Sequence, residues 1–155
     1  MTASFPSGTA DELELYLSWL AFLRGAVLRK ASGITDDQAR WRPDGRLLPL
    51  VGIVNHLTHV EWRWIDGQML GAETGKDDRE YEPPGLTIED ALAAYRRRAA
   101  DTEAAVRSLG DLRTPCQSGD GTDLRFVLLH LINETARHAG HADAVRELLD
   151  GTTGE

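Results

Sequence analysis

Apolar residues recur every three or four positions in four long stretches of this chain, and Gly, Pro and Asp interrupt the sequence between them. In the first stretch the recurring positions are Leu13, Tyr16, Leu20, Leu23 and Val27. This spacing puts apolar side chains on one face of a helix, and no stretch shows the apolar-polar alternation of a half-buried strand. Four helices with one apolar face each are buried most simply in a bundle. The sequence therefore predicts an all-α fold, a four-helix bundle that forms a single domain over residues 1–155.

Capping residues predict where the first two helices begin and end. The first helix should begin near Thr9, because Thr9-Ala10-Asp11-Glu12 resembles a capping box, and it should end near Gly33. The second helix should run from Pro49 to Gly71, because Pro suits a first helical turn and Gly suits a C-terminal cap.

The other two helices have similar boundary signals. The third should begin at Thr87, and the fourth should begin near Thr122 or Asp123 and end before Gly151. Residues 72–86 combine charges with Gly and Pro, so we expect a long irregular connection there, long enough to cross the bundle.

Charge and cysteine content limit the partners that the chain can have. It carries 25 acidic and 17 basic residues, a net charge of -8, and its Lys and Arg are dispersed. Nucleic acid and membrane surfaces are therefore not expected partners, and small molecules fit better. Cys116 is the only cysteine, so no internal disulfide can form. With no signal-like or membrane-spanning stretch, a cytoplasmic location is predicted.

The fourth helix carries ionisable residues on its apolar face. At about 100° per residue, one face combines Val127, Leu131, Glu134, His138, Val145 and Leu149, with His141 at its edge. Burying an ionised group without a partner would cost roughly several kcal/mol, so these side chains need partners that offset this cost. A divalent cation can do so, because a carboxylate and an imidazole one turn apart can point to the same ion.

The second helix offers a third ligand. His56 lies on its predicted buried face, and Gly52, one turn earlier, leaves room near it. Two imidazoles and one carboxylate would leave coordination positions open for water or substrate. A hydrogen-bonded Glu-His network without a metal explains the same spacing equally well.

Several segments, taken together, resemble the DinB-like superfamily of metal-binding four-helix bundles, over about residue 10 to Gly151. They are GITDDQARWRP at 33–43, VNHL at 54–57, EWRW at 61–64 and ETARHAGHAD at 134–143. In particular, they resemble the actinobacterial branch of mini-circle proteins and mycothiol transferases. It implies a metal, zinc first with nickel or iron as alternatives, held by His56, Glu134 and His138. Glu134 matches the pattern of the mycothiol-using isomerases.

The resemblance implies thiol chemistry. Relatives include transferases and isomerases that use mycothiol, bacillithiol or glutathione, so the expected function is a metal-dependent S-transferase or isomerase acting on a small thiol and an electrophile. The metal would lower the pKa of the thiol, so the protein needs no nucleophile of its own and Cys116 is a bystander.

Four further residues are candidates for supporting roles. His59 and His141 are candidate proton carriers, His141 also being a candidate fourth ligand. Arg63 is a candidate for binding a substrate carboxylate, and Trp64 for lining the mouth of the pocket.

Other functions fit the same residues. Two His and one carboxylate also describe non-haem iron enzymes. A non-catalytic metal-binding or stress-response bundle and a metal-free bundle are further alternatives. A homodimer is compatible with the leftover apolar stripe that bundles of this kind often expose.

Overall fold

The computed structural model describes residues 4–8 and 11–154, and its regular elements are helical. The long helices are α1 (Glu12–Ala31), α3 (Leu50–Trp62), α4 (Ile88–Leu109) and α5 (Leu124–Asp150). Within the described ranges there is no strand, only an isolated bridge between Pro115 and Asp123. The predicted all-α bundle is therefore confirmed.

The starts of α4 and α5 match the predicted caps, whereas α1 is capped by Asp11 and not by the predicted Thr9. The side chains of Asp11, Thr87 and Asp123 accept hydrogen bonds from backbone N–H groups three residues further on. Gly110 and Gly151 end α4 and α5 in the left-handed conformation. Thr9 and Ala10, half of the predicted first capping box, lie outside the described residues.

Three short elements were not predicted. They are α2 (Asp36–Arg40) and two 3₁₀ turns, Pro43–Gly45 and Asp78–Tyr81. Thr35 and Gln38 form a reciprocal capping box at the start of α2. Elements of three to five residues are too short to show a period of 3.6, so the apolar pattern does not reveal them.

The second predicted helix is not α-helical throughout. After Trp62 it continues as a π-helical segment, Arg63–Met69, in which the Leu70 N–H reaches the carbonyl of Ile65. Gly71 follows with a φ of 80°. The prediction of one element from Pro49 to Gly71 therefore holds for its length but not for its winding.

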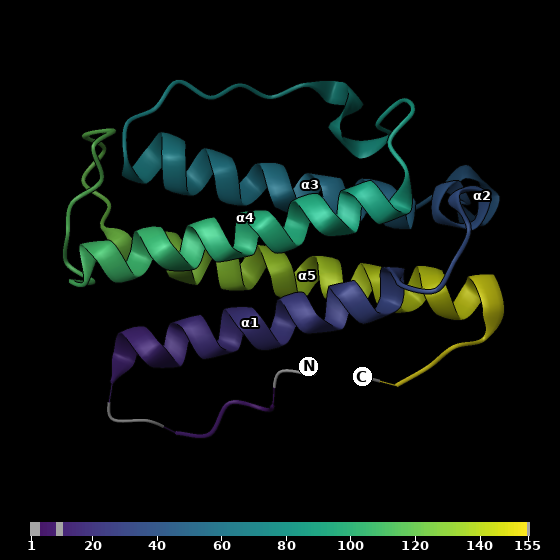
Figure 1. Ribbon diagram of the computed structural model, residues 1–155, viewed down its shortest axis with the longest axis horizontal. Coiled ribbons are helices and arrows are strands. Elements are labelled where there is room, and N and C mark those ends of the chain that lie inside the picture. Colours follow the sequence, from purple (N-terminus) through teal and green to yellow (C-terminus); the bar gives the residue numbers. More distant parts are fainter. Residues whose placement is uncertain (1–3, 9–10, 155) are drawn as a thin grey trace.

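The long connection between α3 and α4 sets the order of the helices. In Figure 1 residues 72–86 run back along α3, so that α3 and α4 point in the same direction while α5 and α1 run opposite to them. The most extensive packing is between α1 and α5 and between α3 and α4, and α3 also packs on α5. This last contact brings together the two helices that carry the predicted metal ligands.

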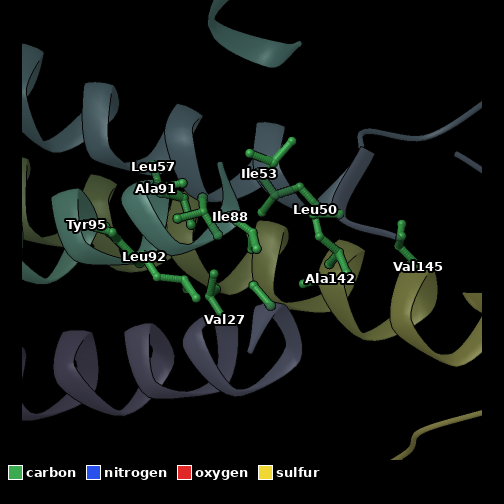
Figure 2. Close-up of a cluster of buried hydrophobic side chains, with 14 of the residues drawn as sticks. Val27, Leu50, Ile53, Leu57, Ile88, Ala91, Leu92, Tyr95, Ala142 and Val145 are labelled. Atoms are coloured by element: carbon green, nitrogen blue, oxygen red, sulfur yellow. The ribbon is translucent and has the colours of Figure 1, made fainter. Parts of the chain in front are cut away.

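The core consists of two clusters of buried apolar side chains. Figure 2 shows the cluster in which Val27 of α1, Leu50 and Ile53 of α3, Tyr95 of α4 and Val145 of α5 come together. A second cluster is built around Leu20, Ile65 and the first two turns of α5. Apolar burial of this extent is the main force that holds the helices together.

The buried face of α5 is centred differently from the prediction. Its buried residues are Leu124, Val127, Leu128, Leu131, Thr135, Ala139, Ala142 and Val145. Glu134 and His138 lie at the edge of this face, and Leu149 is only half-buried. The hydroxyl of Thr135 donates to the carbonyl of Leu131, which satisfies it inside the core. Small and weakly polar residues, which contribute little to an apolar pattern, therefore occupy the centre of the face.

Candidate metal centre

His56 of α3 and Glu134 and His138 of α5 meet between the two helices. One possible ligand atom from each lies within 4.8 Å of the others. Glu134 Oε2 is the shared neighbour, 3.6 Å from His56 Nε2 and 3.7 Å from His138 Nε2. The structure thus brings together the three side chains that the sequence singled out as metal ligands.

These separations are longer than those of a hydrogen-bonded network. Nitrogen–oxygen contacts of roughly 3.6 Å or more are too long for a hydrogen bond, so neither contact of Glu134 is one. Ligand atoms about 2.1 Å from a tetrahedral ion lie roughly 3.4 Å apart, close to the observed spacing. The two separations from Glu134 Oε2 are therefore close to the spacing that a shared cation would require.

Local sequence explains how the three donors reach one point. Glu134 and His138 are one turn apart on α5, which places their side chains next to each other. On α3, a Cβ at Gly52 would lie 1.9 Å from the carbonyl oxygen of Tyr81. Only glycine there allows the 72–86 connection to approach so closely, and the Tyr81 ring then packs 4.9 Å from the His56 ring.

The environment of His138 favours the neutral imidazole. Burial, together with the neighbouring His56, lowers the pKa of His138 from 6.5 to about 4, although Glu134 acts in the opposite direction. Neutral imidazole is the form that binds a metal. Its Nδ1 is buried and has no hydrogen-bond partner among the described residues.

Glu80 is a buried acid beside the centre that the sequence reasoning missed. It belongs to the 3₁₀ turn Asp78–Tyr81, and its side chain is only 1% exposed. Its Oε2 lies 3.3 Å from His56 Nδ1. A charged, breaker-rich connection is normally a solvated loop, so no local signal marks Glu80 as buried.

Arg63 and His59 both lie close to this acid. The guanidinium of Arg63 donates to both oxygens of Glu80, at 2.7 and 3.3 Å. His59 Nδ1 is 2.8 Å from the Asn55 carbonyl, which can only accept, so the proton is on Nδ1 and Nε2 is free to accept. Arg63 therefore already has an anionic partner, and His59 is a neighbour of the centre without being one of its three donors.

His141 and Trp64 have different surroundings. His141 is exposed, and its ring centroid is 5.4 Å from that of His138. Trp64 packs against the His130 ring at 4.0 Å and belongs to the edge of the second core cluster. The roles of His59, Arg63, Trp64 and His141 in catalysis or binding stay predictions.

A cavity of about 560 Å³ lies against α3 beside the centre. Its lining includes Asn55, His59, Trp62, Glu80 and Leu86, and also Gly75, Lys76, Asp77, Arg79, Pro83 and Pro84. The three candidate ligands do not line it. It shares Glu80 with the centre, so the two are neighbours connected through one side chain.

Cys116 is separate from this chemistry. It is buried in the loop between α4 and α5, and its Sγ lies 3.6 Å from the Met69 sulfur in the second core cluster. Its contact with Met69 is that of a small residue packed in an apolar core.

Fold and site together define a helical bundle with a candidate two-histidine, one-carboxylate centre between two helices. The model of the mycothiol-S-transferase family matches residues 15–151. The chain belongs to this family, and with it to the DinB-like superfamily. A comparison with curated proteins found no match. No helix in the described part of the chain is long and apolar enough to cross a bilayer.

Proposed function

We propose that this protein is a divalent-metal-dependent S-transferase that uses a mycothiol-type low-molecular-weight thiol, with His56, Glu134 and His138 as the metal ligands. The observation that carries the proposal is the convergence of three donor atoms within 4.8 Å of one another, with Glu134 Oε2 3.6 and 3.7 Å from the two imidazole nitrogens, too far for hydrogen bonds. Membership of the mycothiol-S-transferase family indicates the thiol.

A metal ion held by these three side chains would attract the negatively charged sulfur of a thiolate. When bound, zinc, or nickel or iron in its place, would lower the pKa of a thiol at an open coordination position and keep it as a thiolate. Two neutral imidazoles and one carboxylate cancel only half of a double positive charge, so the ligands themselves leave the position attractive to an anion. The side chain of Glu134, 24% exposed, is the most accessible of the three.

The protein supplies binding and proton transfer rather than a nucleophile. The sulfur of the thiolate forms a bond to the electrophilic carbon, and the leaving group departs with the bonding electrons. His141, exposed beside His138, would accept the thiol proton and pass it to solvent. His59 and Trp62, which line the neighbouring cavity, would contact the substrates there.

The first test measures the metal content of protein purified without an affinity tag. We expect about one zinc per chain in the wild type and little in His56→Ala, Glu134→Gln or His138→Ala. The matched controls are His130→Gln, one turn before Glu134 on α5 but not among the three donors, and Glu147→Gln, further along the same helix. Both should retain the metal. Iron in place of zinc would favour the oxidative alternative, and no uptake of Zn²⁺, Ni²⁺ or Fe²⁺ would refute the metal centre.

The second test concerns the thiol. Monobromobimane alkylates thiols with release of bromide, so its fluorescence reports formation of the new carbon-sulfur bond. We expect metal-loaded wild type to accelerate this reaction with mycothiol more than with bacillithiol or glutathione, and His138→Ala to lose the acceleration. Metal binding without acceleration for any thiol or further electrophile would favour the non-catalytic binding role.

A further inference from the structure

We propose that Glu80 is the positioning residue of the metal centre: it holds the Nδ1 edge of His56 so that Nε2 faces the position shared with Glu134 and His138. This inference rests on the proposed function, because it assigns a role in preparing the same centre. It also assigns a task to the connection between α3 and α4, which carries Glu80.

The contacts of Glu80 are those of a fixed buried anion. Its Oε2 faces His56 Nδ1 at 3.3 Å, and Arg63 neutralises it through bonds to both oxygens. The side-chain amide of Asn55 donates to its backbone carbonyl at 2.8 Å. A carboxylate at this depth would be costly without such partners. Asn55, His56 and Arg63 all belong to α3 or its π-helical continuation, so that one continuous helical element holds the acid in place.

This pairing decides which nitrogen of His56 is free. An ionised carboxylate only accepts hydrogen bonds, so the proton of a neutral His56 ring lies on Nδ1. The lone pair then lies on Nε2, which is 3.6 Å from Glu134 Oε2. Metal-binding histidines commonly donate their second N–H to a carboxylate in this way, which fixes the ring and makes the ligand more basic.

His138 provides an internal contrast. Its Nδ1 has no hydrogen-bond partner among the described residues, whereas His56 Nδ1 has Glu80. The ring of His138 is therefore held by packing and that of His56 by a charged hydrogen bond as well. We infer that the pre-organisation of the centre depends on the α3 side, and that removing Glu80 loosens the His56 ligand.

The first measurement is the tautomer of His56 in the metal-free protein, by nitrogen-15 NMR of the imidazole rings under conditions where the ring is neutral. We expect the proton on Nδ1 in the wild type and a mixture of tautomers in Glu80→Ala. A proton on Nε2 of wild-type His56 would overturn the proposal. This readout needs no metal and no substrate, so it stands whether or not the proposed function is correct.

The second measurement is Zn²⁺ affinity by competition with a chelator. Glu80→Gln, which keeps the shape but not the charge, should bind about 10- to 100-fold more weakly than the wild type. Glu82→Gln is the matched control, because Glu82 lies on the same connection but is exposed and pairs with Arg42. If Glu80→Gln binds Zn²⁺ with wild-type affinity, the positioning role is wrong. If the wild type itself does not bind Zn²⁺, the proposed metal centre is refuted instead.

Discussion

At the scale of single residues, two ion pairs in the described part of the chain have a carboxylate that is 1% exposed: the first, Arg63 with Glu80, lies beside the candidate centre, and the second lies in the core. The second joins Arg24 of α1 to Glu61 of α3 through two bonds of 2.7 and 2.8 Å, and Thr102 of α4 donates to the same carboxylate. Burial alone would lower the pKa of Arg24, but Glu61 outweighs it and raises that pKa. The pair thus links three helices. Its contribution to the stability of the fold depends on the presence of both partners.

Replacing one partner of this ion pair should destabilise the protein more than replacing both. Glu61→Gln leaves the charge of Arg24 buried and unpaired, so we expect the free energy of unfolding to fall by about 3–5 kcal/mol in chemical denaturation. The double variant Arg24→Met, Glu61→Met should lose less, because no uncompensated charge remains. Arg107→Gln, which removes exposed ion pairs with Glu14 and Glu103, is the control and should lower the free energy of unfolding much less, because solvent screens these pairs. Equal losses in the single and double variants would contradict this account.

The depressed pKa of His138 predicts a pH dependence for the metal-free protein. The native state holds this ring neutral down to about pH 4, whereas the unfolded chain protonates it near 6.5. Between these values the unfolded state binds more protons, so stability should fall as the pH is lowered from about 6.5 to about 4. Urea denaturation at several pH values in the presence of a chelator measures the slope, which should be smaller in His138→Gln. An unchanged slope in that variant would show that other groups cause the dependence.

At the scale of secondary-structure elements, the site depends on the close approach of the 72–86 connection to α3. Tyr81 and Glu80, neighbours in this connection, contact His56 from one side while α5 supplies Glu134 and His138 from the other. Gly52 allows this approach because the carbonyl of Tyr81 occupies the space that a side chain would need. The connection is therefore part of the site as well as a link between helices.

Gly52→Ala should accordingly damage both stability and the site. The new methyl group would overlap the Tyr81 carbonyl, so we expect a loss of about 1–3 kcal/mol in the free energy of unfolding and weaker Zn²⁺ binding. Gly140→Ala is the matched control, since Gly140 lies on α5 between His138 and His141 with open space around its Cβ position. There alanine should stabilise the helix by about 0.5–1 kcal/mol and leave Zn²⁺ binding unchanged. Similar behaviour of the two variants would contradict the role given to Gly52.

At the scale of the whole molecule, the candidate centre links two helices that are far apart in the sequence. An ion held by His56 of α3 and by Glu134 and His138 of α5 would bind the folded protein only, because the donors are dispersed in the unfolded chain. Metal binding would then contribute directly to the stability of the bundle.

Zinc should therefore raise the melting temperature of the metal-free protein. At a free concentration of about 100 times the dissociation constant the gain would be about 2.7 kcal/mol. Differential scanning fluorimetry with increasing Zn²⁺ measures the shift, and His56→Ala should abolish it while His130→Gln preserves it. A shift of equal size in His56→Ala would place the bound zinc elsewhere on the surface.

The single domain, the homodimer, the cytoplasmic location and the absence of nucleic-acid partners also belong to this scale, and they stay predictions. For the homodimer the direct measurement is the mass in solution by light scattering.

Local sequence signals determined the bundle and most of its boundaries. Apolar periodicity, caps such as Thr87 and Asp123, and glycines such as Gly151 act over one or two turns, so they can be read without knowing the fold. The same periodicity predicted that Glu134 and His138 lie together, because residues four apart on a helix are neighbours. The predicted centre of the buried face of α5 differs from the observed one, because Thr135, Ala139 and Ala142 contribute little to an apolar pattern.

Only the tertiary structure decided what lies around the candidate metal ligands. The contact of Glu80 with His56 joins residues 24 positions apart, and it exists because residues 72–86 return along α3. Nothing in the spacing of those residues predicts that path, and a charge in an irregular segment is normally solvated. The pairing of Arg63 with Glu80 and that of Arg24 with Glu61 have the same origin. Periodicity determines which face of a helix is apolar, whereas the partner of each buried charge depends on how the helices and their connections pack together.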